Sequence, residues 1–240
     1  MLMHCARGLV LAFCFATRCT AGELAEFNAA VEQVSVHYRT ALHQLGSGDA
    51  ERGLAEVGHM RKHWAALVDR FGEKRPDAFD ANESYATVLT GVGKRIATAL
   101  TLISARRLEP ARIALAPIRG ELSQMRRASG VMVLADCILD ANTAMDALAV
   151  YKDKPPDWSK PETRFDIAAK AAIYRHELKD CQDLAPSDVR ADPHFQKLID
   201  GALAGVALVP TAIATHDSDL FAHILSELRA FDHQLALRYG

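Results

Sequence analysis

The sequence lacks an excess of charge of either sign. Its 240 residues include 28 Lys and Arg against 30 Asp and Glu, which gives a formal net charge of -2. The two signs are mixed along the chain, so no broad basic field exists to hold a nucleic-acid backbone or an anionic membrane surface. We therefore expect no nucleic-acid partner.

The short motifs that mark common enzyme chemistries are missing as well. The chain contains no Gly-rich phosphate loop, no Ser nucleophile motif and no EF-hand loop. Its carboxylates offer no convincing acid/base pair, because Asp136, Asp140 and Asp146 are spaced as helix caps and solvated helix faces normally are. The sequence therefore predicts a protein that is not an enzyme.

Cysteine is scarce, and three of the five cysteines fall in the first 22 residues. This segment has the composition of an export signal, with Arg7 near its start, an apolar run over residues 9–16 and mostly small residues up to Ala21. We expect residues 1–22 to be a signal peptide. The mature protein would then be periplasmic or secreted, with no membrane span.

Removal of the signal leaves Cys137 and Cys181. An oxidising compartment favours a disulfide between them. If their segments form a helical hairpin with its loop at residues 155–158, the two cysteines lie at similar distances from the turn. Two buried, unpaired thiols are the alternative.

Half of the residues are hydrophobic, and they recur at helical spacing in successive segments. This pattern predicts an all-α protein. Pro117 and Pro210 fall inside two of the predicted helices, where we expect them to cause a kink or bend. The eight predicted helices cover residues 24–45, 49–72, 85–106, 110–130, 132–151, 165–184, 195–215 and 219–240.

An internal repeat organises these helices. Arg61, Arg119 and Arg229 each lie eleven residues before a glycine, and Arg175 stands at the same place in a looser fourth copy. Each copy ends in the second helix of a hairpin. The period of about 56 residues is longer than that of common helical solenoids. We therefore predict four helical hairpin repeats that form two antiparallel four-helix bundles, over residues 23–130 and 131–240.

The repeated arginine has two interpretations. Its guanidinium can bond a helix end or a carboxylate of the neighbouring hairpin while its stem covers apolar surface. Alternatively, several of these arginines together bind an anion. The first interpretation assigns them a structural role.

His59 and His63 form the most specific candidate metal site. They are one helical turn apart and share a helix face, which lets two imidazoles hold one metal ion. No Glu follows His59 as a zinc protease motif requires. Solvated histidines on the polar edge of the helix are the alternative.

Two stretches carry a resemblance to a known family. Gly48-Asp49 followed by an amphipathic helix that ends in Asp69-Arg70-Phe71 resembles the last hairpin of the four-helix-bundle cytochromes, of the c-prime and soluble b types. The stretch 231–239, FDHQLALRY, is similar. The likeness covers about forty residues in each predicted bundle. It implies a four-helix bundle that holds haem for electron transfer.

The chain departs from the c-prime pattern, because residues 64–68 and 233–237 read WAALV and HQLAL where that type has Cys-x-x-Cys-His. This departure excludes covalent haem of that kind. A b-type haem needs only axial ligands, which in this family come from the start of the first helix and the end of the last. In the second bundle the resemblance assigns these places to Met132 and His233.

Two hypotheses about function follow. In the first, an exported protein binds haem or a transition metal, through Met132 and His233 or through His59 and His63, for electron transfer or metal handling. In the second, a cofactor-free helical scaffold holds a periplasmic protein partner in grooves between its hairpins.

Overall fold

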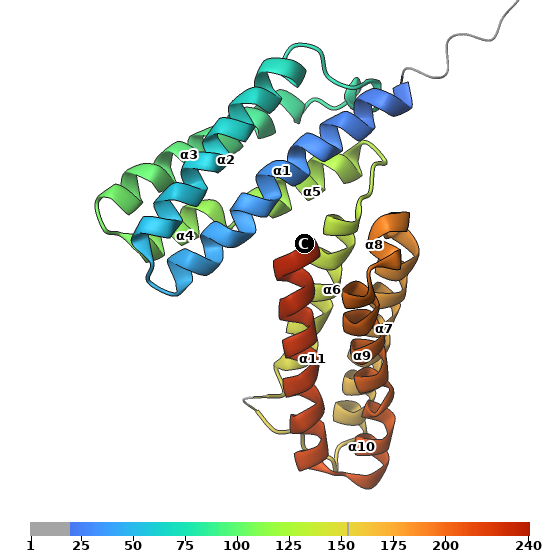
Figure 1. Ribbon diagram of the computed structural model, residues 1–240. Helices are drawn as coiled ribbons and strands as arrows, with labels where there is room; N and C mark the ends of the chain where they lie inside the picture. The colour runs from blue at the N-terminus through green and yellow to red at the C-terminus, as the bar shows by residue number, and fades with distance from the viewer. Residues whose placement is uncertain (1–19, 153) are drawn as a thin grey trace, which may run out of the picture.

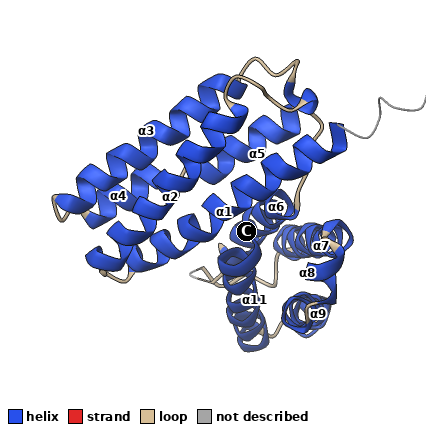
Figure 2. Cartoon of the chain, turned by 45° about the horizontal axis from the view of Figure 1, so that its top comes forward, coloured by secondary structure: helices blue, strands red, loops and turns tan. Residues whose placement is uncertain are grey.

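The computed structural model describes residues 20–152 and 154–240. Throughout this part of the chain the regular elements are helices, with no strand (Figures 1 and 2). The prediction of an all-α protein is therefore confirmed. Residues 1–19 of the predicted signal peptide lie outside the described residues, and residue 20 begins the first helix.

Helices of the N-terminal half, here called the N-half, enclose one hydrophobic core. They are α1 (Thr20–Gly46), α2 (Ala50–Phe71), the short 3-10 helix η1 (Asp77–Phe79), α3 (Tyr85–Ser104), α4 (Leu108–Leu115) and α5 (Ile118–Ala128). The remaining helices, here called the C-half, enclose a second core. They are α6 (Leu134–Ala149), α7 (Pro161–Leu184), α8 (Ser187–Ala191), α9 (Pro193–Ala207), α10 (Val209–Thr215) and α11 (Ser218–Tyr239).

Two predicted helices are each broken into two. Pro117 separates α4 from α5, and α9 ends at Ala207, shortly before Pro210. Proline lacks the N–H that would continue the hydrogen-bond ladder, and its ring clashes with the preceding turn. The expected kink and bend are therefore breaks between separate helices, a stronger effect than the sequence analysis predicted.

The repeated glycines do not share one conformation. Gly130 has a φ of 68°, in the left-handed region that favours glycine. Gly72 has a φ of -68° and simply continues the helical conformation past the end of α2. The start of α2 agrees with prediction, because the side chain of Asp49 accepts a hydrogen bond from the backbone N–H of Arg52 at 3.0 Å.

The N-half core is rich in aromatic contacts. The ring of Phe27 packs edge-on against Phe71 and Phe79, with ring centroids 5.5 and 5.1 Å apart. Two polar aromatic side chains in this core donate hydrogen bonds to backbone carbonyls. The hydroxyl of Tyr85 donates to the carbonyl of Phe71 at 2.9 Å, and the indole N–H of Trp64 donates to the carbonyl of Leu89 at 3.1 Å.

A disulfide crosses the C-half core. Cys137 of α6 and Cys181 of α7 are joined, with their Cα atoms 5.4 Å apart. The predicted pairing is confirmed, and α6 and α7 form the hairpin that it required. At the loop end of this half the indole of Trp158 donates to the hydroxyl of Ser218 at 2.8 Å.

The two halves meet where α5 leads into α6. Figure 1 shows the helices of each half grouped together, with the C-terminal end of α11 beside the middle of α1. The last core residue of the N-half along the chain is Met125, and the first of the C-half is Leu134. Helices α1 and α5 of the N-half and α6 and α11 of the C-half therefore lie at this boundary.

Two stretches of the described residues are long and apolar enough to cross a membrane, by length and composition alone. They are Tyr85–Ser104, which is α3, and Pro193–Thr215, which covers α9 and α10. Core helices of soluble proteins pass the same test, and both stretches supply residues to the two cores.

Candidate functional site

A cleft of about 260 Å³ lies between the two halves, and we call it the junction cleft. The N-half contributes residues of α1 and α5, and the C-half contributes the start of α6, the α8 region and the end of α11. Apolar side chains predominate on its walls. The lining residues are Asn28, Val31, Glu32, Ser35, Arg126, Val133, Leu134, Ala135, Pro186, Val189, Arg238 and Tyr239.

A buried ion pair fixes the two sides of the junction cleft. The guanidinium of Arg126 on α5 donates to both carboxylate oxygens of Asp136 on α6, at 2.7 and 2.5 Å. Their side chains are only 4% and 1% exposed. Asp136 also accepts a hydrogen bond from the backbone N–H of Val133, at 3.2 Å. A bidentate, buried pair of this kind fixes orientation as well as contact.

A second polar network crosses the same boundary through Arg119. Its guanidinium donates to the amide oxygen of Asn142 at 2.8 Å and to the carbonyl of Ala135 at 3.2 Å. The amide of Asn142 in turn donates to the carboxylate of Asp232 at 2.7 Å. Burial lowers the pKa of Arg119 and raises the pKa of Asp232. Burial therefore opposes the charge on both groups, and the hydrogen bonds of this network offset part of that cost.

The structural interpretation of the repeated arginine holds for two of its four copies. Arg119 bonds the neighbouring half, and Arg229 donates to Asp146 at 2.7 Å. Arg61 is exposed, and Arg175 is exposed as well. Within the described chain neither makes a side-chain hydrogen bond or ion pair. The repeat therefore marks a position in the hairpin, while the role of the arginine depends on what faces it.

The polar side chains that line the junction cleft differ in whether they have hydrogen-bond partners. The amide oxygen of Asn28 is buried and has no hydrogen-bond partner in the described part of the chain. Ser35 is satisfied locally, because its hydroxyl donates to the carbonyl of Val31 at 3.0 Å. Tyr239 donates to Asp192 at 2.6 Å, and burial together with this bond raises the pKa of Tyr239 to about 12.

Charged groups stand at the cleft edge. Arg238 is exposed, and no ion pair of its side chain is found in residues 20–152 and 154–240. Glu32, also exposed, is paired with Arg39 at 2.8 Å. The cleft thus offers apolar walls, one buried amide that lacks a partner and one cation at its edge. This arrangement suits a small molecule with an apolar body, a hydrogen-bonding group and a negative charge.

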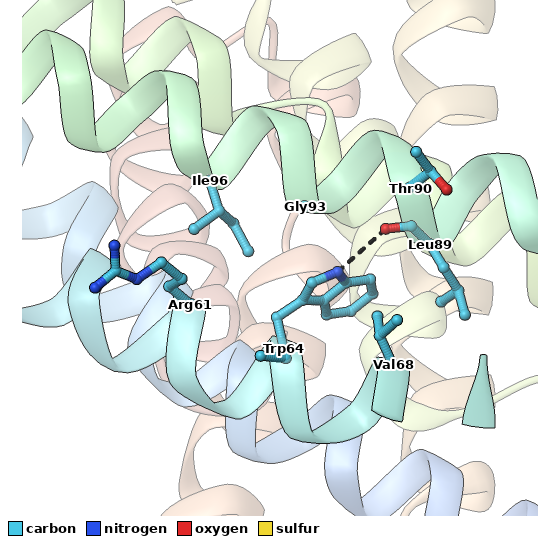
Figure 3. A pocket seen from close by; sticks show the side chains of 8 residues that line it. Arg61, Trp64, Val68, Leu89, Thr90, Gly93 and Ile96 are labelled. Atoms are coloured by element: carbon cyan, nitrogen blue, oxygen red, sulfur yellow. Dashed lines mark hydrogen bonds between the residues drawn. The ribbon is translucent and has the colours of Figure 1, made fainter. Parts of the chain in front are cut away.

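A second hollow, of about 300 Å³, lies between α2 and α3 in the N-half (Figure 3). Figure 3 shows Trp64 on its floor, with the indole bonded to the Leu89 carbonyl and Arg61 at its edge. Its lining is apolar apart from Arg61, Thr90 and the backbone. The indole N–H is already satisfied, so this hollow offers few groups that would orient a ligand.

Met132 and His233, the predicted haem ligands, belong to the segments of α6 and α11, which pack against each other. Met132 precedes α6 and is 46% exposed. His233 lies in α11 and lines a cavity of about 230 Å³ together with Arg39, Arg119 and other residues. Met132 is not part of that lining. Neither the junction cleft nor the hollow between α2 and α3 is lined by either residue.

His59 and His63 lie on α2, where a third histidine joins them. The ring of His37, on α1, stacks against both, with centroids 5.0 Å from His59 and 5.2 Å from His63. Glu56 bonds the Nδ1 atom of His37 at 2.7 Å. Burial, with His37 nearby, lowers the pKa of His63. The sequence analysis missed His37, because its place on the facing helix is not visible from spacing along one helix.

The junction cleft was also missed. Its clearest signal in the sequence is Arg126, which shares a helix face with the apolar residues Leu122 and Met125. A charged residue on an apolar face requires a partner. Its partner Asp136 lies beyond the predicted boundary between the bundles, where helical periodicity gives no information on contacts.

Comparison with known proteins gives no match. No protein-family model matches the sequence, and no curated protein and no solved structure is significantly similar to the chain. The argument for function therefore rests on the residues themselves.

Proposed function

We propose that the protein is an exported, non-enzymatic binding protein that holds a small amphipathic ligand in the junction cleft between two four-helix bundles. The observation that carries this proposal is the cleft itself, which has apolar walls, the buried and unpartnered amide oxygen of Asn28, and Arg238 at its edge. Ligand sites occur preferentially at such boundaries between folded units.

The packing of the helices supports two bundles. If α4 and α5 count as one broken helix, the N-half is four helices around one core, and α1 packs on α2 and α4 while α3 packs on α2, α4 and α5. If α9 and α10 count as one, the C-half is four helices as well, with α6 on α7 and α11, and α9 on both of these. Each half then consists of two hairpins.

Export and a non-catalytic role have separate support. The disulfide between Cys137 and Cys181 fits an oxidising compartment. The hydrogen-bond and ion-pair partners of histidine side chains in the described chain are carboxylates and the guanidinium of Arg164. Activation of a nucleophile would instead place a Ser, Thr or Cys beside a histidine.

Anilinonaphthalene sulfonate is a suitable probe, because it joins an apolar aromatic body to one anionic group. We expect the folded protein to bind it at one site, with an increase in probe fluorescence. Ser35→Phe should abolish most of this binding, since the added ring fills the cleft from the α1 side. Arg238→Ala should weaken it about tenfold or less, as loss of one exposed charge contact does.

Val36→Phe is the matched control. Val36 is the next residue on α1, is 45% exposed and does not line the junction cleft. Probe binding should be unchanged in this variant, and circular dichroism checks that all three variants are folded. Equal binding by Ser35→Phe and Val36→Phe would place the probe elsewhere and contradict the proposal.

Haem binding through Met132 and His233, as the cytochrome resemblance implies, stays a prediction. An absorption spectrum of the full chain purified with haem supplied tests it. A Soret band that is lost in His233→Ala would establish a cytochrome-like protein. A cofactor-free scaffold for a protein partner would give neither a Soret band nor one saturable site for the probe.

A further inference from the structure

The three histidines between α1 and α2 lie at a spacing that metal coordination uses. Two imidazoles bound to one tetrahedral zinc ion, with Zn–N distances of about 2.0–2.1 Å, have ring centroids about 5 Å apart. The centroid of His37 lies 5.0 Å from that of His59 and 5.2 Å from that of His63. His59 and His63 share one face of α2, one turn apart.

In this structure the side chains of the three histidines are not arranged around one common point. The ring of His37 is nearly parallel to the other two, at interplanar angles of 20° and 21°. Among the described residues, no three His, Cys, Asp or Glu side chains could hold a metal ion in the positions that they occupy in this structure. The imidazoles must therefore turn about their side-chain torsions to converge, and the exposed position of His59 leaves room for this rotation.

Glu56 supplies an independent observation. Its carboxylate lies 2.7 Å from Nδ1 of His37, and both side chains are about one quarter exposed, at 26% and 24%. A carboxylate on one ring nitrogen fixes the tautomer and leaves the other nitrogen as a lone-pair donor. Metal-binding histidines carry an outer carboxylate of this kind very often, because it orients the ring and raises its basicity. In His37 the nitrogen with a lone pair available to a metal ion would be Nε2.

The charged side chains near the three histidines are of both signs. Lys62, adjacent to His63 in sequence, is exposed and contributes positive charge near the histidines. Glu56 contributes negative charge at the Nδ1 atom of His37. Three neutral imidazoles with one outer carboxylate suit borderline divalent ions such as Zn²⁺, Cu²⁺ or Ni²⁺ more than Mg²⁺ or Ca²⁺, which prefer oxygen ligands.

We propose that His37, His59 and His63 together bind one late first-row divalent metal ion, with Glu56 as the carboxylate that positions His37. The three ligands leave at least one coordination position open to water or to a group from a partner. The site lies on the α1 and α2 surface of the N-half and shares no residue with the junction cleft. It therefore stands independently of the function proposed above.

The test is zinc binding by the full chain, purified without a polyhistidine tag and measured by isothermal titration calorimetry. We expect one zinc ion per chain. His37→Ala, His59→Ala and His63→Ala should each weaken binding by more than tenfold. Glu56→Gln should weaken it by about ten- to a hundredfold, which is the range for loss of an outer carboxylate.

His43→Ala is the matched control, because His43 lies further along the same helix α1 and is exposed. It should leave zinc binding unchanged, as should Ser35→Phe in the junction cleft. Since His59 is exposed, His59→Ala is expected to fold and carries the test if His37→Ala does not. Binding that survives His59→Ala, or that His43→Ala weakens equally, overturns the proposal. Full binding by a folded His37→Ala also overturns it, because it leaves only a two-histidine site.

Discussion

Both halves of the molecule are helices around a hydrophobic core, but the described residues contain a covalent cross-link only in the C-half. The N-half contains no cysteine, and its core is held by aromatic rings around Phe27 and by the bonds of Trp64 and Tyr85 to backbone carbonyls. The C-half has a disulfide between α6 and α7. Aromatic contacts occur in the C-half as well, for example between Trp158 and Phe221, so the disulfide is an addition to a packed core. The polar junction joins the two halves.

The largest effect is expected from the ion pair that links the halves. Arg126→Ala leaves the carboxylate of Asp136 buried without its cation, which should cost about 5 kcal/mol of unfolding free energy. Urea unfolding followed by circular dichroism measures this change. The loss should appear in both halves, because the pair joins α5 to α6.

Arg127→Ala is the control for that variant. Arg127 is the adjacent arginine and pairs with Asp140, but these two side chains are 37% and 34% exposed. Solvent screens such a pair, so its loss should cost less than about 1 kcal/mol. Similar losses in the two variants would show that burial of the Arg126 pair does not govern the junction.

The disulfide should distinguish the two halves. Replacing both Cys137 and Cys181 by Ala opens a loop with a sequence separation of 44, for which chain entropy gives about 4 kcal/mol. Hydrogen exchange of backbone amides should then become faster in α6 and α7, while α2 and α3 change little. Equal acceleration in all four helices would mean that the halves unfold as one unit and would contradict the comparison.

The two tryptophans offer a smaller contrast. Trp64→Phe removes the buried hydrogen bond from the indole to the carbonyl of Leu89 in α3 and should cost about 1–1.5 kcal/mol. Trp158→Phe frees only the hydroxyl of Ser218, which is exposed and can bond water, so the loss should be below about 1 kcal/mol. Thermal unfolding of the two variants compares them directly. The reverse order would show that the indole bond is unimportant for the N-half.

The smallest effect is a pH dependence in the C-half. Burial raises the pKa of Asp232 above its ordinary value of 3.8, so the folded state holds this proton more tightly than the unfolded state does. The ionised, buried carboxylate destabilises the folded state. This cost is absent below the pKa that Asp232 has in the unfolded state, and it is complete once the pH has risen past the pKa that Asp232 has in the folded state. Wild type should therefore gain stability relative to Asp232→Asn as the pH falls towards 4. A constant difference between the two from pH 7 to pH 4 would contradict this assignment.

Helical periodicity accounts for most of what was predictable. It gave the helices, the Asp49 cap and the hairpin that brings Cys137 to Cys181, because each depends on residues close in sequence. The breaks at Pro117 and Pro210 were located correctly but underestimated.

The site could not be predicted in the same way. The Arg126–Asp136 pair, the junction cleft and the approach of His37 to His59 all depend on which face of one helix meets another. Spacing along a helix shows which residues share a face, but it does not show what that face contacts. The sequence therefore placed His59 and His63 on one helix face, whereas the approach of His37 and Glu56 is visible only in the structure.

The most direct test of the junction cleft is hydrogen exchange of the full chain with and without anilinonaphthalene sulfonate. The account predicts slower exchange in α1 around residues 28–35 and at the start of α6 around residues 133–137, on both sides of the cleft. Slower exchange confined to α2 and α3, around the hollow of Figure 3, would contradict it.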